Sequence, residues 1–259
     1  MHILLTNDDG YHASGIQTLY QALRSQTKHE ISIVAPEGQR SAMGHSITLF
    51  QPLFITEYDL DGDQKGFAVS GTPSDCVKIA IQAGLISRPD LLISGINQGS
   101  NLGTDIFYSG TVSAAMEGVI LGVPSLALSL ASYDFLDFEP SASYLAEHLD
   151  YFVSCYQEGL MNINFPGKPR SEWAGVKVTR LGKTVYDNVF ERRVNPRGRT
   201  YYWQCGNRVQ DLEEGTDLRA IQDDFVSITP MHSDLTDYKC LQNWKSLFEK
   251  ADGFDVNGV

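Results

Sequence analysis

The sequence predicts an α/β fold in which helices cover both faces of a mainly parallel β-sheet. Ile3, Leu4 and Leu5 form a continuous apolar run, which is typical of a strand buried on both faces. Further runs of this kind alternate with helical patterns as far as residue 166. With 259 residues, of which 42% are apolar and 20% charged, the chain can bury a sizeable core.

The first strand ends in an acidic turn, Asn7 to Gly10, with Asp8 and Asp9 adjacent. Apolar residues at 16, 19, 20 and 23 then predict an amphipathic helix. Ligands of open α/β sheets bind at the carboxyl ends of the strands, where this turn lies. Two neighbouring carboxylates repel each other, so they favour a hard divalent cation. The alternative is that one of them only caps the helix.

A second strand at 31–35 leads into the polar loop 37–45, which we expect beside the acidic turn. The residues of this loop that could bind a ligand or take part in chemistry are Ser41 and His45. Taken singly, each is more typical of a loop residue that makes a hydrogen bond than of a ligand. Residues 47–58 suggest an extended excursion, followed by a short strand at 67–69. Thr72, Pro73 and Asp75 then fit a helix start, so we read Asp75 as a capping residue first.

A third buried strand at 91–94 opens into a predicted loop, 95–103, with three glycines and two asparagines, Asn97 and Asn101. Such a loop lets the backbone approach a ligand, and Asn offers an oxygen to a cation or a donor to a phosphate. Turn geometry alone is the alternative explanation. Its position after a buried strand favours a site.

Ser109, Gly110 and Thr111 lie at the start of the next helix, which the apolar spacing from Val112 to Val119 predicts. Free N–H groups and hydroxyls at a helix start suit a phosphate. The segment is not a Walker A loop, because it has no Gly-Lys-Ser/Thr ending. A plain Ser/Thr cap is the alternative.

Strands at 123–130 and 160–166 and a helix at 141–156 complete the βα alternation. Beyond residue 166, stretches 176–180 and 200–204 resemble the two strands of a long hairpin. Five of the eleven arginines gather nearby, either to meet an acidic surface or substrate or simply on a solvated hairpin. A strand at 225–230 and a terminal helix with Leu241 and Trp244 on one face end the pattern.

Composition excludes several function classes. A net charge of −12 disfavours binding to nucleic acid polymers or anionic membranes, although a bound cation would still permit a small anionic substrate. The four cysteines are scattered, which argues against a zinc site or a disulfide framework. We expect no signal peptide and no membrane span, and hence a cytoplasmic protein.

Together the four loops make an oxygen-ligand site for a hard cation beside a phosphate site. That combination indicates metal-assisted transfer of a phosphoryl group to water. In this arrangement the chain resembles the SurE family of survival-protein phosphatases (5′/3′-nucleotidases) over nearly its whole length. The motifs that carry the resemblance are 3–10 (ILLTNDDG), 70–77 (SGTPSDCV), 94–103 (SGINQGSNLG), 108–115 (YSGTVSAA), 162–166 (NINFP) and 214–217 (EGTD).

The resemblance implies a Rossmann-like three-layer sandwich with a protruding β-hairpin arm and a C-terminal helix. It implies one domain over 1–259, with a catalytic core at 1–166 and an oligomerisation segment at 167–259. It also implies one divalent ion per subunit, Mg²⁺ or Mn²⁺, and a homodimer or homotetramer. The implied residues are metal ligands Asp8, Asp9, Ser41 and Asn97, and phosphate contacts Asn101, Ser109, Gly110 and Thr111.

The implied substrates are nucleoside 5′-monophosphates, 3′-monophosphates and, in some members, short polyphosphate. We expect attack by a metal-activated water, with Asp8 and Asp9 as the catalytic residues; Asp9 as base or nucleophile is the alternative. His12 and His45 are weaker candidates for protonating the leaving oxygen. Ala42 and Asp224 stand where the family usually has glycine, which leaves the loop flexibility and the turn geometry there open.

A Rossmann-type nucleotide binder without hydrolysis is the competing function. The pair Asp8 and Asp9 argues against it, because a binder of anionic phosphate gains nothing from two carboxylates. A phosphatase of the haloacid-dehalogenase type needs Asp-x-Asp-x-Thr after the first strand, which residues 7–10 do not supply.

Overall fold

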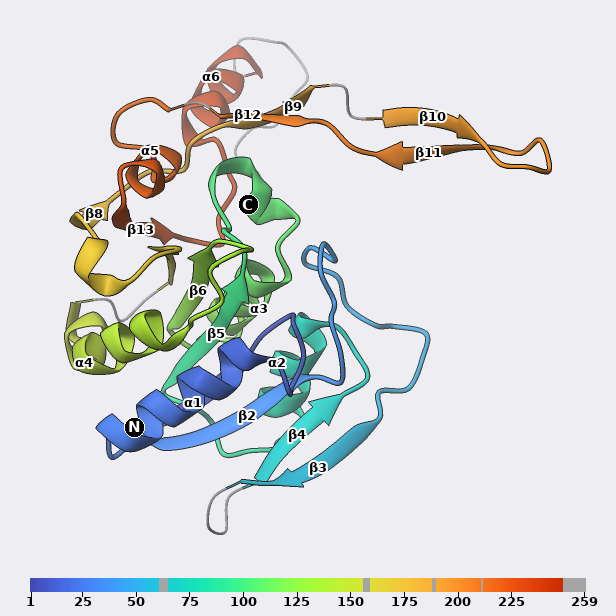
Figure 1. Cartoon of the computed structure of the whole chain (residues 1–259). Helices are drawn as coiled ribbons and strands as arrows, with labels where there is room; N and C mark the ends of the chain where they lie inside the picture. Colours follow the sequence, from blue (N-terminus) through green and yellow to red (C-terminus); the bar gives the residue numbers. More distant parts are fainter. Residues whose placement is uncertain (61–64, 156–158, 188–189, 211, 249–259) are drawn as a thin grey trace.

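The computed structural model describes residues 1–60, 65–155, 159–187, 190–210 and 212–248 (Figure 1). Its strands are β1 (His2–Thr6), β2 (Glu30–Pro36), β3 (Ile55–Asp59), β4 (Lys65–Val69), β5 (Leu91–Gln98), β6 (Ser125–Ala131), β7 (Leu160–Pro166), β8 (Gly175–Val178), β9 (Thr184–Asp187), β10 (Phe190–Val194), β11 (Thr200–Gln204), β12 (Asn207–Gln210) and β13 (Phe225–Met231). Its helices are α1 (Ser14–Gln26), α2 (Pro73–Gln82), α3 (Gly110–Ile120), α4 (Glu139–Cys155), α5 (Asp217–Gln222) and α6 (Tyr238–Phe248), with 3-10 helices η1 (Gly103–Phe107) and η2 (Arg170–Glu172). The predicted α/β class is confirmed; the last residue of the helix expected at 141–156 lies outside the described residues.

The main sheet has nine strands in the order β3-β4-β2-β1-β5-β6-β7-β13-β8. The pairs from β4 through β2, β1, β5 and β6 to β7 are all parallel. The chain runs outward from β1 through β2 to β4, and then returns to place β5 on the other side of β1. Because the strand order reverses between β1 and β5, their carboxyl ends border the crevice where open sheets bind ligands.

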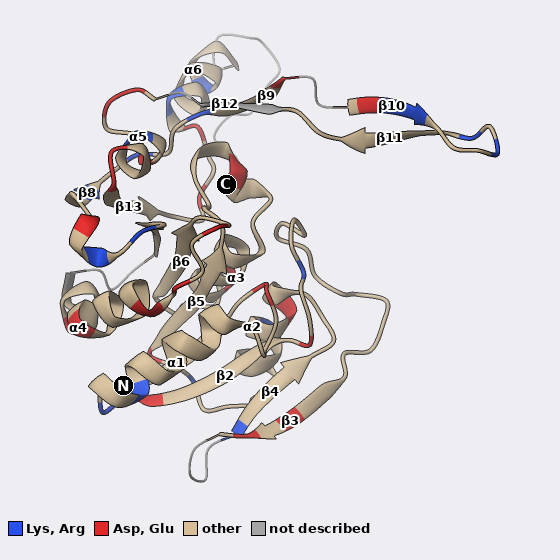
Figure 2. Ribbon diagram, viewed as in Figure 1, with Lys and Arg blue, Asp and Glu red and all other residues tan. Residues whose placement is uncertain are grey.

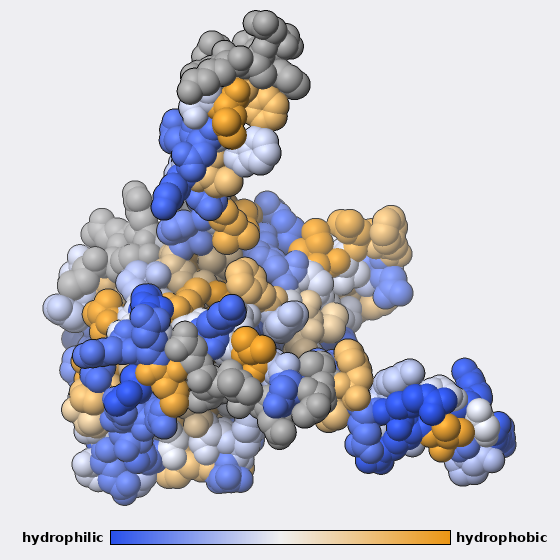
Figure 3. Space-filling model, turned by 90° about the horizontal axis from the view of Figure 1, so that it is seen from above, coloured by the Kyte–Doolittle hydropathy of each residue, from blue (hydrophilic) through white to orange (hydrophobic). Residues whose placement is uncertain are grey.

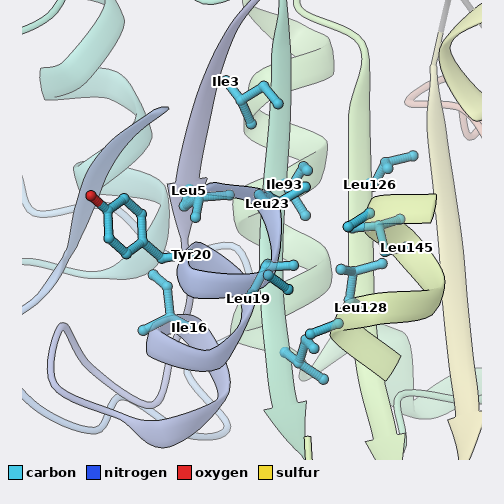
Figure 4. Close-up of a cluster of buried hydrophobic side chains, with 14 of the residues drawn as sticks. Ile3, Leu5, Ile16, Leu19, Tyr20, Leu23, Ile93, Leu126, Leu128 and Leu145 are labelled. Atoms are coloured by element: carbon cyan, nitrogen blue, oxygen red, sulfur yellow. The ribbon is translucent and has the colours of Figure 1, made fainter. Parts of the chain in front are cut away.

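Helices cover the sheet on both faces, as expected. On one face α1 and α4 cover β1, β5 and β6, and their side chains form one buried cluster to which Ile16, Leu19, Leu5 and Leu128 belong (Figure 4). On the other face α2 and α3 form a second buried cluster that includes Val77. Two separate apolar clusters therefore hold the sheet rigid beneath the loops at its carboxyl edge.

The predicted role of Asp75 is confirmed. Thr72 Oγ1 accepts a hydrogen bond from Asp75 N at 3.1 Å, and Asp75 Oδ2 accepts one from Thr72 N at 2.9 Å. Pro73 occupies the first turn of α2. Asp75 also accepts a bond from the Thr48 hydroxyl at 2.6 Å, so it fixes the 47–58 excursion as well as the helix start.

The hairpin predicted from 176–180 and 200–204 is wrong in one strand. Residues 175–178 form β8, which joins the main sheet parallel to β13. The partner of β11 is β10, antiparallel, with Val194 opposite Thr200. A tight turn joins β10 to β11, and in it Asn195 N donates to Arg199 O. β11 therefore pairs with β10, the strand directly before it in the sequence, and not with the more distant residues 175–178.

The β10–β11 hairpin projects from the body, and β9 pairs with β12 at its base (Figure 1). The basic residues on β10 and at the hairpin tip, all of them arginine, are blue in Figure 2. Large apolar and aromatic side chains on both extensions are exposed. Figure 3 shows orange atoms on α6 and a small orange area on the otherwise mostly blue and pale hairpin. The exposed side chains are Phe190, Val194, Tyr201, Tyr202 and Trp203 on the hairpin and Leu241, Trp244 and Leu247 on α6.

Ala42 and Asp224 are the non-glycine residues with positive φ in the described part of the chain, at 57° and 63°. They are also the two positions where the resemblance implies glycine in many family members. The backbone therefore keeps a left-handed conformation that glycine adopts more cheaply. Among the described residues, no helix is both long and apolar enough to cross a membrane.

Candidate active site

The acidic turn after β1 is closed by its own asparagine. Asn7 Oδ1 accepts a hydrogen bond from Gly10 N at 3.1 Å, and Asn7 Nδ2 donates to Gly10 O at 2.9 Å. Gly10 has φ of 107°, and a Cβ there would lie 3.0 Å from the Cα of Gly38. The turn therefore holds Asp8 and Asp9 in place at the end of β1.

Asp8 lies against the start of α3. The Thr111 hydroxyl donates to Asp8 Oδ1 at 2.5 Å, and the Asp8 side chain is 5% exposed. Gly110 permits this approach, because a Cβ at that position would lie 2.6 Å from the Asp8 Cβ and 2.8 Å from Oδ2. One carboxylate thus meets the loop predicted to bind phosphate.

Burial raises the pKa of both carboxyl groups. The pKa of Asp8 rises to about 6, mainly through burial, with a smaller increase from the charge of Asp9 and an opposing decrease from the Thr111 hydrogen bond. Burial also raises the pKa of Asp9, which accepts a bond from Gln98 N at 3.2 Å. Among the described residues, no Lys, Arg or His forms an ion pair with either group. Two desolvated neighbouring carboxylates without a cation are the arrangement that a divalent ion would stabilise.

We expect the metal-free protein to lose stability relative to Asp8→Asn as the pH rises from 4 to 7. A carboxyl whose folded pKa lies above its unfolded value stabilises the fold below the unfolded value and loses that contribution as the pH rises through 6. The rise from 3.8 to about 6 corresponds to a relative loss of about 3 kcal/mol. Denaturant unfolding of both proteins in EDTA at several pH values measures it. A difference that does not change with pH would contradict it.

The loop that carries Ser41 is fixed on both sides of that residue. Arg40 N donates to Asp8 O at 2.7 Å, and Gly44 N donates to Tyr108 O at 3.1 Å. The loop thus bridges the acidic turn and the segment before α3. Ser41 itself is exposed. Its hydroxyl is available to a ligand at this edge.

Asn97 lies in a strand, not in the loop predicted for 95–103. β5 continues to Gln98, because an irregularity between Ser94 and Asn97 lets it pair again with β6, Asn97 opposite Ser129. The Asn97 Nδ2 donates to Gly99 O at 2.8 Å. Its Oδ1 accepts no hydrogen bond from any residue that the structure describes, and it lies next to Gln98, whose N–H donates to Asp9.

The start of α3 presents donors for an anion. Ser109 is its N-cap, and its Oγ accepts a bond from Val112 N at 3.1 Å. The first bond along the helix runs from Ser113 N to Ser109 O, so the N–H groups of Gly110 and Thr111 precede it. With the Ser109 hydroxyl, they form a compact donor set beside Asp8, suited to phosphate.

Asn101 is held by a buried network. Its backbone N donates to Asn164 Oδ1 at 2.9 Å, and its carbonyl accepts from Asn162 and Asn164 at 2.8 and 3.0 Å. Its Nδ2 donates to Ser129 Oγ at 2.8 Å. This support was not predicted from the sequence. The signal for it was the alternation of asparagines in the apolar strand 160–166.

Two further contacts escaped sequence reasoning. Thr111 donates its hydroxyl to Asp8, and its backbone N–H also interacts with that carboxylate. Asp217, at 0% exposure, accepts bonds from Gly103 N and Gly182 N at 2.7 Å each and ties the loop before η1 to the C-terminal part. For Asp217, the sequence signal was its place in the motif 214–217.

The two histidines have other neighbours. His45 Nε2 lies 2.7 Å from Glu117 Oε2, and Lys78 contacts the other oxygen of that buried carboxylate at 3.3 Å. The bond with His45 is the main cause that lowers the pKa of Glu117. His12 packs edge-on against Tyr11 and Tyr58. A role for either histidine in leaving-group protonation stays a prediction.

The donor chemistry fits a hard divalent ion. In the described ranges no group of three or more His, Cys, Asp and Glu forms a metal site. The oxygen donors at this edge are instead the carboxylates of Asp8 and Asp9, the exposed Ser41 hydroxyl and Asn97 Oδ1. Oxygen-only sets of this kind suit Mg²⁺ or Mn²⁺.

Comparisons with known proteins place the chain in a family. The family described as "Survival protein SurE" matches residues 3–188. The 5′-nucleotidase SurE of Desulfitobacterium hafniense is 60% identical over 238 residues, 92% of this chain and 93% of that protein. The 5′-nucleotidase SurE of Pelotomaculum thermopropionicum is 50% identical and covers 97% of this chain and 96% of its own length. The crystal structure of the SurE protein from Aquifex aeolicus has a TM-score of 0.80 at 38% identity, covering 96% of this chain and 100% of that one.

Proposed function

The chain belongs to the SurE family, and from that premise we propose that it is a 5′-nucleotidase that hydrolyses nucleoside 5′-monophosphates to nucleoside and phosphate. The observation that carries the proposal is the contact between Asp8 and the start of α3. It puts a carboxylate suited to a cation within 2.5 Å of the Thr111 hydroxyl, on the helix that offers phosphate donors. A phosphate binder without hydrolysis would have no use for a second carboxylate beside it.

In this proposal different residues bind the phosphate, orient Asp8 and take part in the reaction. The N–H groups of Gly110 and Thr111 and the hydroxyl of Ser109 bind the phosphate oxygens, and Asn101 supports the loop that borders them. Thr111 also orients Asp8 through its hydroxyl. Asp9, anchored by Gln98 N, faces the reacting group and either holds the ion or accepts a proton from the attacking water.

Asp8, Asp9, Ser41 and Asn97 would hold one Mg²⁺ or Mn²⁺ per subunit. When bound, a divalent ion neutralises charge on the phosphoryl oxygens and lowers the pKa of water. The raised pKa values of Asp8 and Asp9 support this assignment, because a cation favours their ionised forms. Activity toward 3′-monophosphates and polyphosphate, a cytoplasmic location and the division at residue 166 stay predictions.

The test is phosphate release from AMP with Mg²⁺ or Mn²⁺ and again after addition of EDTA. We expect EDTA to reduce the rate by at least about a hundredfold, because the ion supplies several kcal/mol of charge stabilisation. Excess Mg²⁺ or Mn²⁺ should restore the rate. Binding of AMP without metal-dependent release would favour the non-hydrolytic binder.

We also propose a homodimer or homotetramer that forms through the β10–β11 hairpin and α6. A two-stranded hairpin is marginally stable in water by itself, and this one exposes Tyr202 and Trp203 at 60% and 59%. The isolated apolar faces of both extensions support burial against a second copy.

Trp203→Ser is expected to weaken subunit association by at least about tenfold, because exposed aromatic residues at interfaces act as hot spots. Sedimentation velocity over a concentration series measures it. The matched control is Tyr151→Ser, an exposed aromatic of α4 on the body of the molecule. Equal masses for all three proteins would contradict the proposal.

A further inference from the structure

A cavity of about 300 Å³ lies directly beside Asp9. Its lining includes Asp9, Ser14, Gln39, Gln98, Leu136 and Phe138. We propose that this cavity binds the nucleoside part of the substrate, with Leu136 and the amides of Gln39 and Gln98 as the residues that recognise the base. The inference rests on the proposed nucleotidase function and adds the site that makes the enzyme select nucleotides over other phosphate esters.

Position is the first argument. Asp8 and Asp9 are consecutive, but they face different surroundings. Asp8 contacts Thr111 at the start of α3, whereas Asp9 lines the cavity. A phosphate bound at α3 is joined to its nucleoside through one ester oxygen, so the nucleoside must lie in an adjoining space. The cavity is such a space, because it is lined by Asp9, the residue next to Asp8 in the chain.

Size and wall chemistry are the second argument. A volume of about 300 Å³ is at the lower end of the range of about 300–1,000 Å³ for small-molecule sites, enough for a single compact ligand. Leu136 is 55% exposed, although it is a large apolar side chain, and it borders the same space as the ring of Phe138. A flat base with two apolar faces would cover this surface.

The polar groups are the third argument. The side chains of Gln39 and Gln98 are exposed, and each carboxamide offers one acceptor and two donors. Gln39 makes no side-chain hydrogen bond with any described residue, and Gln98 Nε2 makes only a long one, 3.4 Å, to Tyr133 O. These groups match the edge of a base. The Ser14 hydroxyl can serve a ribose hydroxyl in the same way.

A larger cavity, about 430 Å³, offers the competing location. It lies between α3 and the segment after β13, with Met116, Leu181, Met231 and Leu235 in its lining. The wall is mainly apolar, and it includes none of the predicted metal or phosphate residues. The smaller cavity is favoured because Asp9 belongs to it.

The experiment compares AMP with ribose 5-phosphate, which has the same sugar and phosphate but no base. The quantity is the ratio of kcat/KM for the two substrates, in the wild type, Leu136→Ser, Gln39→Ala and Leu235→Ser. Leu136 and Leu235 are both exposed, so the same substitution is matched in chemistry and leaves the core intact. We expect the ratio to fall about tenfold in Leu136→Ser, several-fold in Gln39→Ala and not in Leu235→Ser.

A fall in Leu235→Ser without one in Leu136→Ser would place the base in the larger cavity and overturn the inference. An unchanged ratio in all variants would overturn it as well. A wild type that releases no phosphate from AMP would instead overturn the nucleotidase proposal. Saturation-transfer NMR with adenosine, which has no phosphate, then still tests the cavity: adenosine should bind the wild type and not Leu136→Ser, and equal binding would refute it.

Discussion

Asp9→Asn is expected to lower kcat for AMP by about a thousandfold, the largest effect we predict for a change of one side-chain atom. The amide keeps the shape of the side chain and can still accept the hydrogen bond from Gln98 N, so the turn should remain closed. It removes the negative charge, and with it both a strong ligand for a divalent ion and a base for the attacking water. Initial rates at saturating AMP measure the effect.

Asp150→Asn is the matched control, because this carboxylate is 90% exposed on α4 and, among the described residues, its one ion pair is with His29 at 3.5 Å. It should retain wild-type turnover. Partial recovery of Asp9→Asn in excess Mn²⁺ would identify Asp9 as a ligand, whereas no recovery would favour a base. A phosphorylated aspartate trapped in the wild type and detected by mass spectrometry would overturn attack by water.

The parallel core could be predicted from the sequence because its signals are local. A run such as Leu91 to Ile93 that is apolar at successive positions indicates a strand buried on both faces. The capping residues Thr72 and Asp75 likewise carry their structural role in their spacing. The carboxyl ends of parallel strands necessarily share one edge, so the order of the segments was enough to place Asp8, Ser41 and Asn97 there.

The remaining features depend on pairings between distant segments. The stretch 175–178 has the composition of an edge strand or an arm, and its parallel pairing with β13 depends on the path of the chain between them. β5 passes through Gly95 and still pairs with β6, with an irregular register between Ser94 and Asn97. Such an irregularity cannot be read from a glycine-rich sequence, which is equally typical of a loop. The bond from Thr111 to Asp8 spans 103 positions and could not be anticipated from a local motif.

Gly110→Ala is expected to lower kcat/KM for AMP by about a hundredfold while the protein stays folded. Helix propensity alone would favour alanine at this position by about 1 kcal/mol. The added Cβ, however, would lie 2.6 Å from the Asp8 Cβ and 2.8 Å from its Oδ2, which is closer than real Cβ atoms approach their neighbours. Asp8 belongs to the buried turn after β1, so the start of α3 must move, and misplacement by about 1 Å can cost about a hundredfold in rate.

Gly38→Ala is the matched control, because a Cβ there meets no atom within 4 Å. It should leave kcat/KM within about twofold of the wild type, as expected for a change without new contacts. Denaturant unfolding of both variants separates a local effect from unfolding. Full activity in Gly110→Ala would mean that the contact between Asp8 and α3 does not position the phosphate, and the proposed division between phosphate and cation sites would then have to be abandoned.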